Sequence, residues 1–263
     1  MLSEAAARPP DGQGAAARRE RPRRIGDLEV LLLEAWDPED EGLVAGITTA
    51  PDDFGLATCG SGWDLADRYE RLSEALGFEA VAVGRQVHGT AVSTVPGLVA
   101  RGLWIVGETD GLAADAPGIL LAVTAADCVP VFLADRGSGA LALLHAGWRG
   151  AAAGVLARGL EAMARLRGTD VRDCVVHLGP AICGDCYEVG PEVLARFGRR
   201  ASGPARLDLR AWLASEATRL GLARDAVSVS TWCTSCDRGR LHSHRASGGR
   251  DGRMAAFLGR RAG

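Results

Sequence analysis

Two histidines and one cysteine, each at the edge of an apolar run, are the residues of this chain best suited to chemistry. They lie in the segments Gln86-Val87-His88-Gly89, Ala126-Asp127-Cys128-Val129-Pro130 and His145-Ala146-Gly147-Trp148-Arg149-Gly150. Two imidazoles and a thiolate can hold a zinc ion and leave its fourth position open, as in catalytic zinc sites. The spacing leaves a second interpretation open, in which the three are separate structural residues at strand ends.

The elements that must position these residues are predicted from hydrophobic patterns. Apolar runs over 129–134 and 140–145 flank turn residues 135–139, a pattern typical of an antiparallel hairpin. Such a hairpin, centred near Gly137, places residue 129 opposite residue 145. Cys128 and His145 then lie at the same open end. A strand over 81–87 runs directly into His88, which reaches the other two residues only by tertiary packing.

The remaining pattern predicts the fold class. Strands and helices alternate without a regular βαβ rhythm, and the hairpin is antiparallel. We therefore expect a single α/β or α+β domain with mixed β-sheets flanked by helices. Residues 1–25 are predicted to be a disordered tail and 26–263 the catalytic domain. Strands are expected over 28–33, 44–49, 119–125, 175–178 and 227–232, helices over 64–76, 151–167 and 209–220, an acidic turn at 37–41 and a closing element over 253–258.

Composition excludes several classes of function. The formal net charge of −3 offers no electrostatic footprint for nucleic acid. No apolar run approaches the roughly 18 residues of a membrane span, and the N-terminus lacks the apolar region of a secretory signal. The seven cysteines are an odd number and lie mainly beside the motif segments. These features indicate a reduced, cytoplasmic protein, which we expect to be a monomer or homodimer.

Two further groups beside the histidines could take part. Arg149 and Gly150 lie where the segment after His145 enters a helix, and free backbone amides with an arginine there favour an anion. The alternative is a tight connection with a solvated arginine. Asp127 could orient a ligand histidine, or it could cap a turn.

A second set of cysteines has metal-ligand spacing. Cys183-Gly184-Asp185-Cys186 and Cys233-Thr234-Ser235-Cys236 are two CxxC pairs, the spacing of structural zinc knuckles, although 46 residues separate the pairs. A rival set joins Cys233 and Cys236 to His242 and His244. Reduced thiols without a metal are the third interpretation.

Several motifs in order resemble the YfiH family, also called the laccase-domain or multicopper polyphenol oxidoreductase-like family, which includes peptidoglycan editing factors and human FAMIN. The resemblance spans roughly residue 26 to the C-terminus. The motifs are the three segments above together with Leu178-Gly179-Pro180-Ala181-Ile182 and Tyr187-Glu188-Val189-Gly190.

This resemblance implies a zinc site formed by His88, Cys128 and His145, with copper as a poorer alternative, because five histidines cannot supply a multi-copper cluster. It implies a purine nucleoside phosphorylase acting on adenosine, inosine and methylthioadenosine with phosphate, and an adenosine deaminase activity in which zinc activates water. Phosphate is expected near Arg149 and Gly150, with Arg245 as a further binding residue.

The chain departs from the family pattern at two places. Ala50-Pro51-Asp52-Asp53-Phe54-Gly55 stands where the family has Arg-x-Gly-Gly-x-Ser, so an arginine is lost and two acids are gained. Ala246 replaces the second arginine of the family's Phe-Ser-Tyr-Arg-Arg-Asp, while Arg245 keeps the first. These losses put phosphorolysis in doubt. They also leave open a decayed, non-enzymatic binding protein. A separate alternative is a metal-free hydrolase or amidase acting on cell-wall precursors, with Cys128 as nucleophile and His145 as its base.

Overall fold

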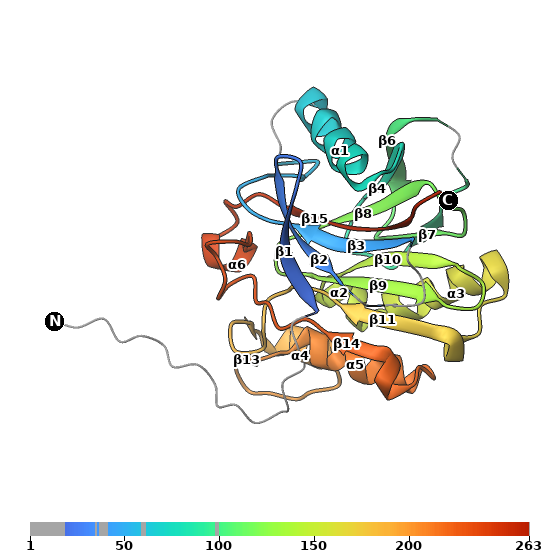
Figure 1. The fold of residues 1–263 in the computed structure, drawn as a ribbon. Helices are drawn as coiled ribbons and strands as arrows, with labels where there is room; N and C mark the ends of the chain where they lie inside the picture. Colours follow the sequence, from blue (N-terminus) through green and yellow to red (C-terminus); the bar gives the residue numbers. More distant parts are fainter. Residues whose placement is uncertain (1–18, 35, 37–41, 59–61, 98–99, 263) are drawn as a thin grey trace.

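Two mixed β-sheets pack face to face, and helices cover both outer surfaces (Figure 1). The computed structural model describes residues 19–34, 36, 42–58, 62–97 and 100–262. The first sheet has the order β1 (Glu20–Ile25), β2 (Leu28–Leu33), β3 (Leu43–Thr48), β15 (Met254–Arg260), β8 (Ile119–Ala125), β4 (Ala80–Arg85) and β6 (Gly102–Glu108). The second has the order β14 (Val227–Val229), β11 (Cys174–Leu178), β9 (Val129–Asp135), β10 (Leu141–Ala146), β7 (Gly111–Ala114) and β5 (Val92–Thr94).

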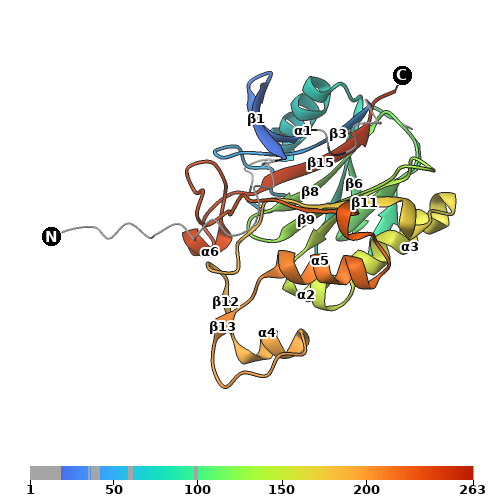
Figure 2. The same cartoon turned by 60° about the horizontal axis from the view of Figure 1, so that its bottom comes forward.

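The helices form the outer layers. Helix α1 (Gly62–Leu76) packs on β4 and β6, whereas α3 (Val155–Arg167) and α5 (Leu209–Arg219) cover the second sheet, as Figures 1 and 2 show. The shorter elements are α2 (Trp148–Ala152), α4 (Pro191–Arg196), α6 (His244–Ser247), two 3₁₀ turns (Val171–Asp173 and Arg224–Ala226) and the small ladder of β12 (Glu188–Val189) and β13 (Ala205–Arg206). The expected fold class, mixed sheets flanked by helices, is confirmed.

Burial on both faces explains why the central strands are continuous apolar runs. In β8, Ile119, Leu121 and Val123 enter the core between the sheets, while Leu120 and Ala122 enter the core beneath α1. Successive side chains of a strand point to opposite faces of the sheet. When both faces are covered, every position is buried, and the strand is apolar along its whole length. Of the described helices, none is long and apolar enough to cross a membrane.

The predicted hairpin is present as β9 and β10, with a register that differs by one residue from the expectation. Val129 pairs with Ala146 and His145 pairs with Pro130, instead of residue 129 facing residue 145. Cys128 therefore lies one residue beyond the last pair, next to Gly147. The open end of the hairpin still holds both residues, as predicted.

Three other predictions need correction. Residues 20–25, assigned to the tail, form β1, which pairs antiparallel with β2. The single helix expected over 151–167 is two helices, because Gly154 adopts a left-handed conformation (φ 90°) that a continuous helix cannot contain. The strand expected over 227–232 ends at Val229. The acidic turn at 37–41 and residues 1–18 of the expected tail lie outside the described residues.

Candidate metal centre and its pocket

The structure brings together the three side chains that the sequence singled out. One donor atom from each of His88, Cys128 and His145 lies within 4.8 Å of the other two. The two imidazole rings stand edge to face, with centroids 4.9 Å apart and planes at 80°. His88 follows β4 of the first sheet, whereas Cys128 directly precedes β9 and His145 lies in β10, both of the second sheet. The centre therefore lies where the two sheets meet.

Gln86 fixes the start of the turn that carries His88. Its amide Nε2 donates to the carbonyl of Thr124 (2.8 Å), and its Oε1 accepts from the backbone N–H of Thr124 (2.6 Å). These bonds continue the contact between β4 and β8 beyond the end of β4 at Arg85. The strand predicted to reach Val87 thus gives way to a turn held by a side chain.

Asp110 organises the centre, and the sequence analysis did not identify it. Its carboxylate accepts the backbone N–H groups of Val87 (3.2 Å), His88 (2.9 Å) and Gly89 (2.6 Å). The same carboxylate accepts from Nδ1 of His145 at 2.9 Å. That bond fixes the tautomer of His145 and leaves Nε2 as its ligand atom. Asp110 is fully buried, so one carboxylate orients both histidines.

Close packing and an unusual backbone accompany this arrangement. A Cβ at Gly147 would lie 3.0 Å from Sγ of Cys128 and 3.2 Å from Cδ2 of His88, so only glycine fits there without a shift. His88 (φ 60°) and Asp127 (φ 90°) are the described non-glycine residues with positive φ. Such conformations are uncommon for side-chain-bearing residues and cluster at functional sites.

The centre favours a thiolate. Burial opposes ionisation of Cys128, but the neighbouring His145 and His88 outweigh it and lower the pKa of the thiol to about 6. Burial likewise opposes protonation of His145, but Cys128 and Asp110 raise its pKa to about 9. Without a metal, the pair is thus a thiolate and an imidazolium. The thiolate is the form of cysteine that binds metals, and an ion would displace the proton from His145.

His88, Cys128 and His145 form part of the wall of a pocket of about 530 Å³. Four arginines also line it, and Asp127 is the one acidic residue in the described lining. Aromatic surface comes from Trp148 and Tyr187, and burial raises the pKa of Tyr187 to about 12, so that its hydroxyl keeps its proton. The lining arginines are Arg85, Arg149, Arg245 and Arg253. Such a pocket suits an anionic group beside a flat ring.

Of Arg149 and Gly150, the two residues expected to bind an anion, only Arg149 is part of the described pocket lining. Arg149 lines the pocket and lies over the ring of Trp148, 4.3 Å from its centroid. Gly150 instead packs against the turn of His88, because a Cβ there would lie 2.7 Å from the carbonyl oxygen of Gly89. The helix that begins here, α2, has only five residues. The arginine side chains, rather than a long helix dipole, supply the positive charge.

Arg245 and Asp127 join the C-terminal segment to the pocket. The guanidinium of Arg245 lies over the ring of Tyr187 (5.0 Å) and donates to the carbonyl of Glu188 (2.7 Å). Asp127 accepts from the hydroxyls of Thr234 (2.6 Å) and Ser243 (2.7 Å) and from the backbone N–H of Arg245 (2.6 Å). Asp127 therefore positions this segment and orients no ligand histidine.

The two acids gained near residue 52 do not enter the pocket lining. The carboxylate of Asp53 accepts from the backbone N–H of Gly55 (2.9 Å), the hydroxyl of Thr58 (2.8 Å) and the backbone N–H of Arg253 (2.8 Å). Asp53 thus positions Arg253, the residue directly before β15. One of the two acids gained beside the lost arginine therefore supports another arginine in the pocket.

All five histidines are described, and they do not gather as a multi-copper cluster would require. His177 bonds Glu20 and Ser228 in the core, and His242 bonds the carbonyl of Asp52. His244 lies in the pocket wall beside Arg253. Two imidazoles and one thiolate remain at the centre, a donor set that fits a single zinc ion.

A family model described as multi-copper polyphenol oxidoreductase laccase matches residues 54–261. The chain belongs to this family. It is 33% identical to the purine nucleoside phosphorylase YlmD of Geobacillus stearothermophilus, over 87% of this chain and 94% of the relative. It is 34% identical to the adenosine deaminase RL5 of an unknown prokaryotic organism, over 55% of this chain and 59% of that protein.

A solved structure supports the fold of this family member. The crystal structure of YlmD from Geobacillus stearothermophilus superposes with a TM-score of 0.82 at 30% identity, covering 94% of this chain and 100% of that one. The resemblance expected from the sequence motifs is therefore confirmed, both by the family match and by the fold.

Proposed function

We propose that this chain is a zinc-dependent purine nucleoside phosphorylase that also deaminates adenosine. One observation carries the proposal: His88, Cys128 and His145 converge in the wall of a pocket that four arginines line. The names of the relatives support the substrate class. The free thiols of the six described cysteines favour a cytoplasmic location.

The three converging side chains would hold the zinc ion, and Asp110 would keep their geometry. When bound, zinc supplies Lewis acidity and lowers the pKa of a water ligand, which provides a nucleophile for deamination. Deamination of adenosine adds water at C6 of the purine and releases ammonia. Because the three ligands also line the pocket, a purine ring within it can approach them.

The arginines suit the second reaction. In phosphorolysis an oxygen of phosphate bonds to C1′ of the ribose, the bond from C1′ to the purine nitrogen breaks, and its electron pair leaves with the base. Arg149, Arg245 and Arg253 line the pocket, and guanidinium groups are suited to hold the phosphate dianion there. The rings of Trp148 and Tyr187 offer surfaces on which a purine can stack.

Product analysis tests the proposal directly. Adenosine is incubated with and without phosphate, the products are separated by chromatography, and the zinc content of the same batch is measured. We expect adenine and ribose 1-phosphate only when phosphate is present, and inosine in both reactions. Cys128→Ala should lower both activities strongly. Loss of a residue that only hydrogen-bonds a metal ligand lowers activity by about 10- to 100-fold, and loss of a ligand itself should cost more.

The matched control is Cys174→Ala, which removes a thiol buried in β11 outside the pocket lining and should keep both activities. A wild-type sample that is active after chelation, with no zinc bound, would contradict the zinc-dependent proposal. It would favour the second candidate, a hydrolase in which the Cys128 thiolate attacks the substrate and His145 supplies the proton. The lowered pKa of Cys128 beside His145 is the observation that favours that candidate.

A further inference from the structure

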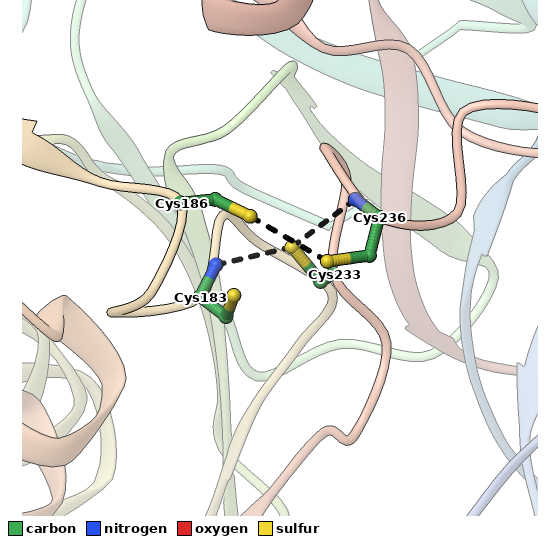
Figure 3. Close-up of side chains that lie close together, drawn as sticks. All are labelled: Cys183, Cys186, Cys233 and Cys236. Carbon is green, nitrogen blue, oxygen red and sulfur yellow. Dashed lines mark hydrogen bonds between the residues drawn. The ribbon is translucent and has the colours of Figure 1, made fainter. Parts of the chain in front are cut away.

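Four cysteines outside the pocket lining form a second cluster, which the proposed function does not use (Figure 3). The sulfur atoms all lie within 4.8 Å of one another, and they belong to Cys183, Cys186, Cys233 and Cys236. The two CxxC segments are 46 residues apart in sequence, but a parallel bridge between Ala181 and Cys233 places them side by side.

The distances between the sulfurs match a single tetrahedral ion. Four thiolates at about 2.3 Å from a zinc ion lie about 3.8 Å from one another. Sγ of Cys186 and Sγ of Cys236 are 3.5 Å apart, well beyond the about 2.05 Å of a disulfide bond. The cluster therefore has the dimensions of a metal site in which each sulfur contributes one bond.

Backbone amides already point at one of the sulfurs. Sγ of Cys233 accepts the N–H of Cys183 at 3.3 Å and the N–H of Cys236 at 3.4 Å, and Figure 3 draws both bonds. Each CxxC segment also starts a turn: the N–H of Cys186 donates to the carbonyl of Cys183 (3.0 Å), and the N–H of Asp237 donates to the carbonyl of Cys233 (2.9 Å). Hydrogen bonds to sulfur stabilise the thiolate form, and turns of this kind direct both thiols of a pair to one point.

We propose that Cys183, Cys186, Cys233 and Cys236 bind a structural zinc ion. Four protein ligands close the coordination shell, which distinguishes this site from the three-ligand centre in the pocket. The rival set with His242 and His244 does not assemble, because His242 bonds the carbonyl of Asp52 and His244 lies in the pocket wall.

The ion would join two walls of the pocket. Tyr187 follows Cys186 directly and lines the pocket, and Thr234 follows Cys233 and donates to Asp127. A backbone hydrogen bond already joins these segments, since the N–H of Thr234 donates to the carbonyl of Ala181 (3.2 Å). Zinc at the four cysteines would thus hold the wall with Tyr187 against the segment that leads to Arg245.

Metal counting separates the two sites. Wild type, Cys128→Ala, Cys236→Ser and the control Cys174→Ala are purified without chelator, and zinc per chain is measured by mass spectrometry. We expect two, one, one and two ions respectively. X-ray absorption at the zinc edge of Cys128→Ala should show four sulfur neighbours at about 2.3 Å.

Each outcome decides the proposal. If Cys236→Ser does not fold, Cys128→Ala still reports the all-sulfur site. If neither variant folds, X-ray absorption of the wild type decides: it must show more sulfur neighbours per zinc than the one that the pocket site supplies. Loss of all zinc in Cys128→Ala, iron at the four cysteines, or a Cys186–Cys236 disulfide in the wild type would overturn it. If the pocket holds no zinc but the cluster does, wild type and Cys128→Ala both carry one ion, so failure of the proposed function is recognisable.

Discussion

Asp110 shows how a single buried carboxylate can organise a candidate metal centre without being one of its donor residues. It binds three consecutive amides of the turn that carries His88, and it binds the imidazole of His145. Burial opposes its ionisation, but His145 and the amide of Gly89 keep the pKa of this carboxyl below its usual value. The residue is therefore charged whenever the centre is assembled at neutral pH.

Asp110→Asn should weaken zinc binding at the pocket by about 10- to 100-fold. The amide NH₂ of asparagine would face N–H donors of the turn, which also costs about 1–3 kcal/mol of stability. A zinc competition titration and urea unfolding measure the two effects. The control is Asp135→Asn, in which a buried carboxylate of the hairpin turn is replaced and zinc affinity should not change. Unchanged affinity in Asp110→Asn would contradict the assigned role.

Sequence reasoning could identify the three candidate ligands, which the structure brings together, but it could not identify the carboxylate that organises them. His88, Cys128 and His145 lie at the ends of apolar runs, and their residue types are those of metal sites. Asp110 has no such signal, because its partners lie 22 and 35 residues away and the sequence shows only an Asp-Gly pair of the kind found in turns. Its role depends on the packing of β6 and β7, which no local pattern predicts.

Between elements, the contact that matters for the centre joins α2 to the turn of His88. Gly150 in α2 lies against the carbonyl of Gly89, and Gly147 lies against two ligands. The neighbour of Gly150 is a backbone oxygen, which cannot rotate away, whereas the neighbours of Gly147 are the side chains of Cys128 and His88. The absence of side chains at these positions lets the first and second sheets approach at the centre.

Gly150→Ala should separate these elements. A Cβ only 2.7 Å from the Gly89 oxygen forces a backbone shift, which we expect to cost about 1–3 kcal/mol and to reduce zinc affinity at the pocket. Thermal unfolding and zinc titration measure both. Gly203→Ala is the control, because nothing lies within 4 Å of its Cβ and neither quantity should change. A variant as stable as the wild type with full zinc affinity would show that the contact is not required.

Local sequence patterns predicted those strands well whose successive residues are nearly all buried. The hairpin and β8 are long apolar runs, and both were found. The break at Gly154 was missed because the flanking Ala-rich residues favour helix on either side of it. β1 was missed because four of its residues are exposed and charged or proline, so it has no apolar alternation to detect.

Across the whole molecule, the missed strand β1 links the two sheets. Glu20 of β1, in the first sheet, lies 2.9 Å from Nε2 of His177 of β11, in the second. Both side chains are buried. Burial opposes ionisation of Glu20, but the bond and charge of His177 lower its pKa below the usual value. A buried hydrogen bond between Glu20 and His177 thus helps to fix one sheet on the other.

Glu20→Gln should lower the free energy of unfolding at pH 7 by about 1–3 kcal/mol, because a neutral amide replaces a buried charged acceptor. The pKa of Glu20 is lower in the folded state than its unfolded value of 4.5, so its carboxylate stabilises the fold at pH values above 4.5. This stabilisation is lost as the pH falls through the folded pKa. The difference between variant and wild type should therefore vanish in acid. Urea unfolding across pH measures it. Arg23→Ala, which breaks an exposed pair with Glu34, should cost at most about 1 kcal/mol at any pH.

The position of β15 has a consequence for how the chain is made. This strand, residues 254–260, lies between β3 and β8 in the middle of the first sheet. While the ribosome is still translating, β3 and β8 lack the neighbour that both require, and the two cores that share β15 stay open. Domains ordinarily gain structure as they emerge. Here the first sheet closes only after residue 260 has been added, so the pocket beside it is completed late in synthesis.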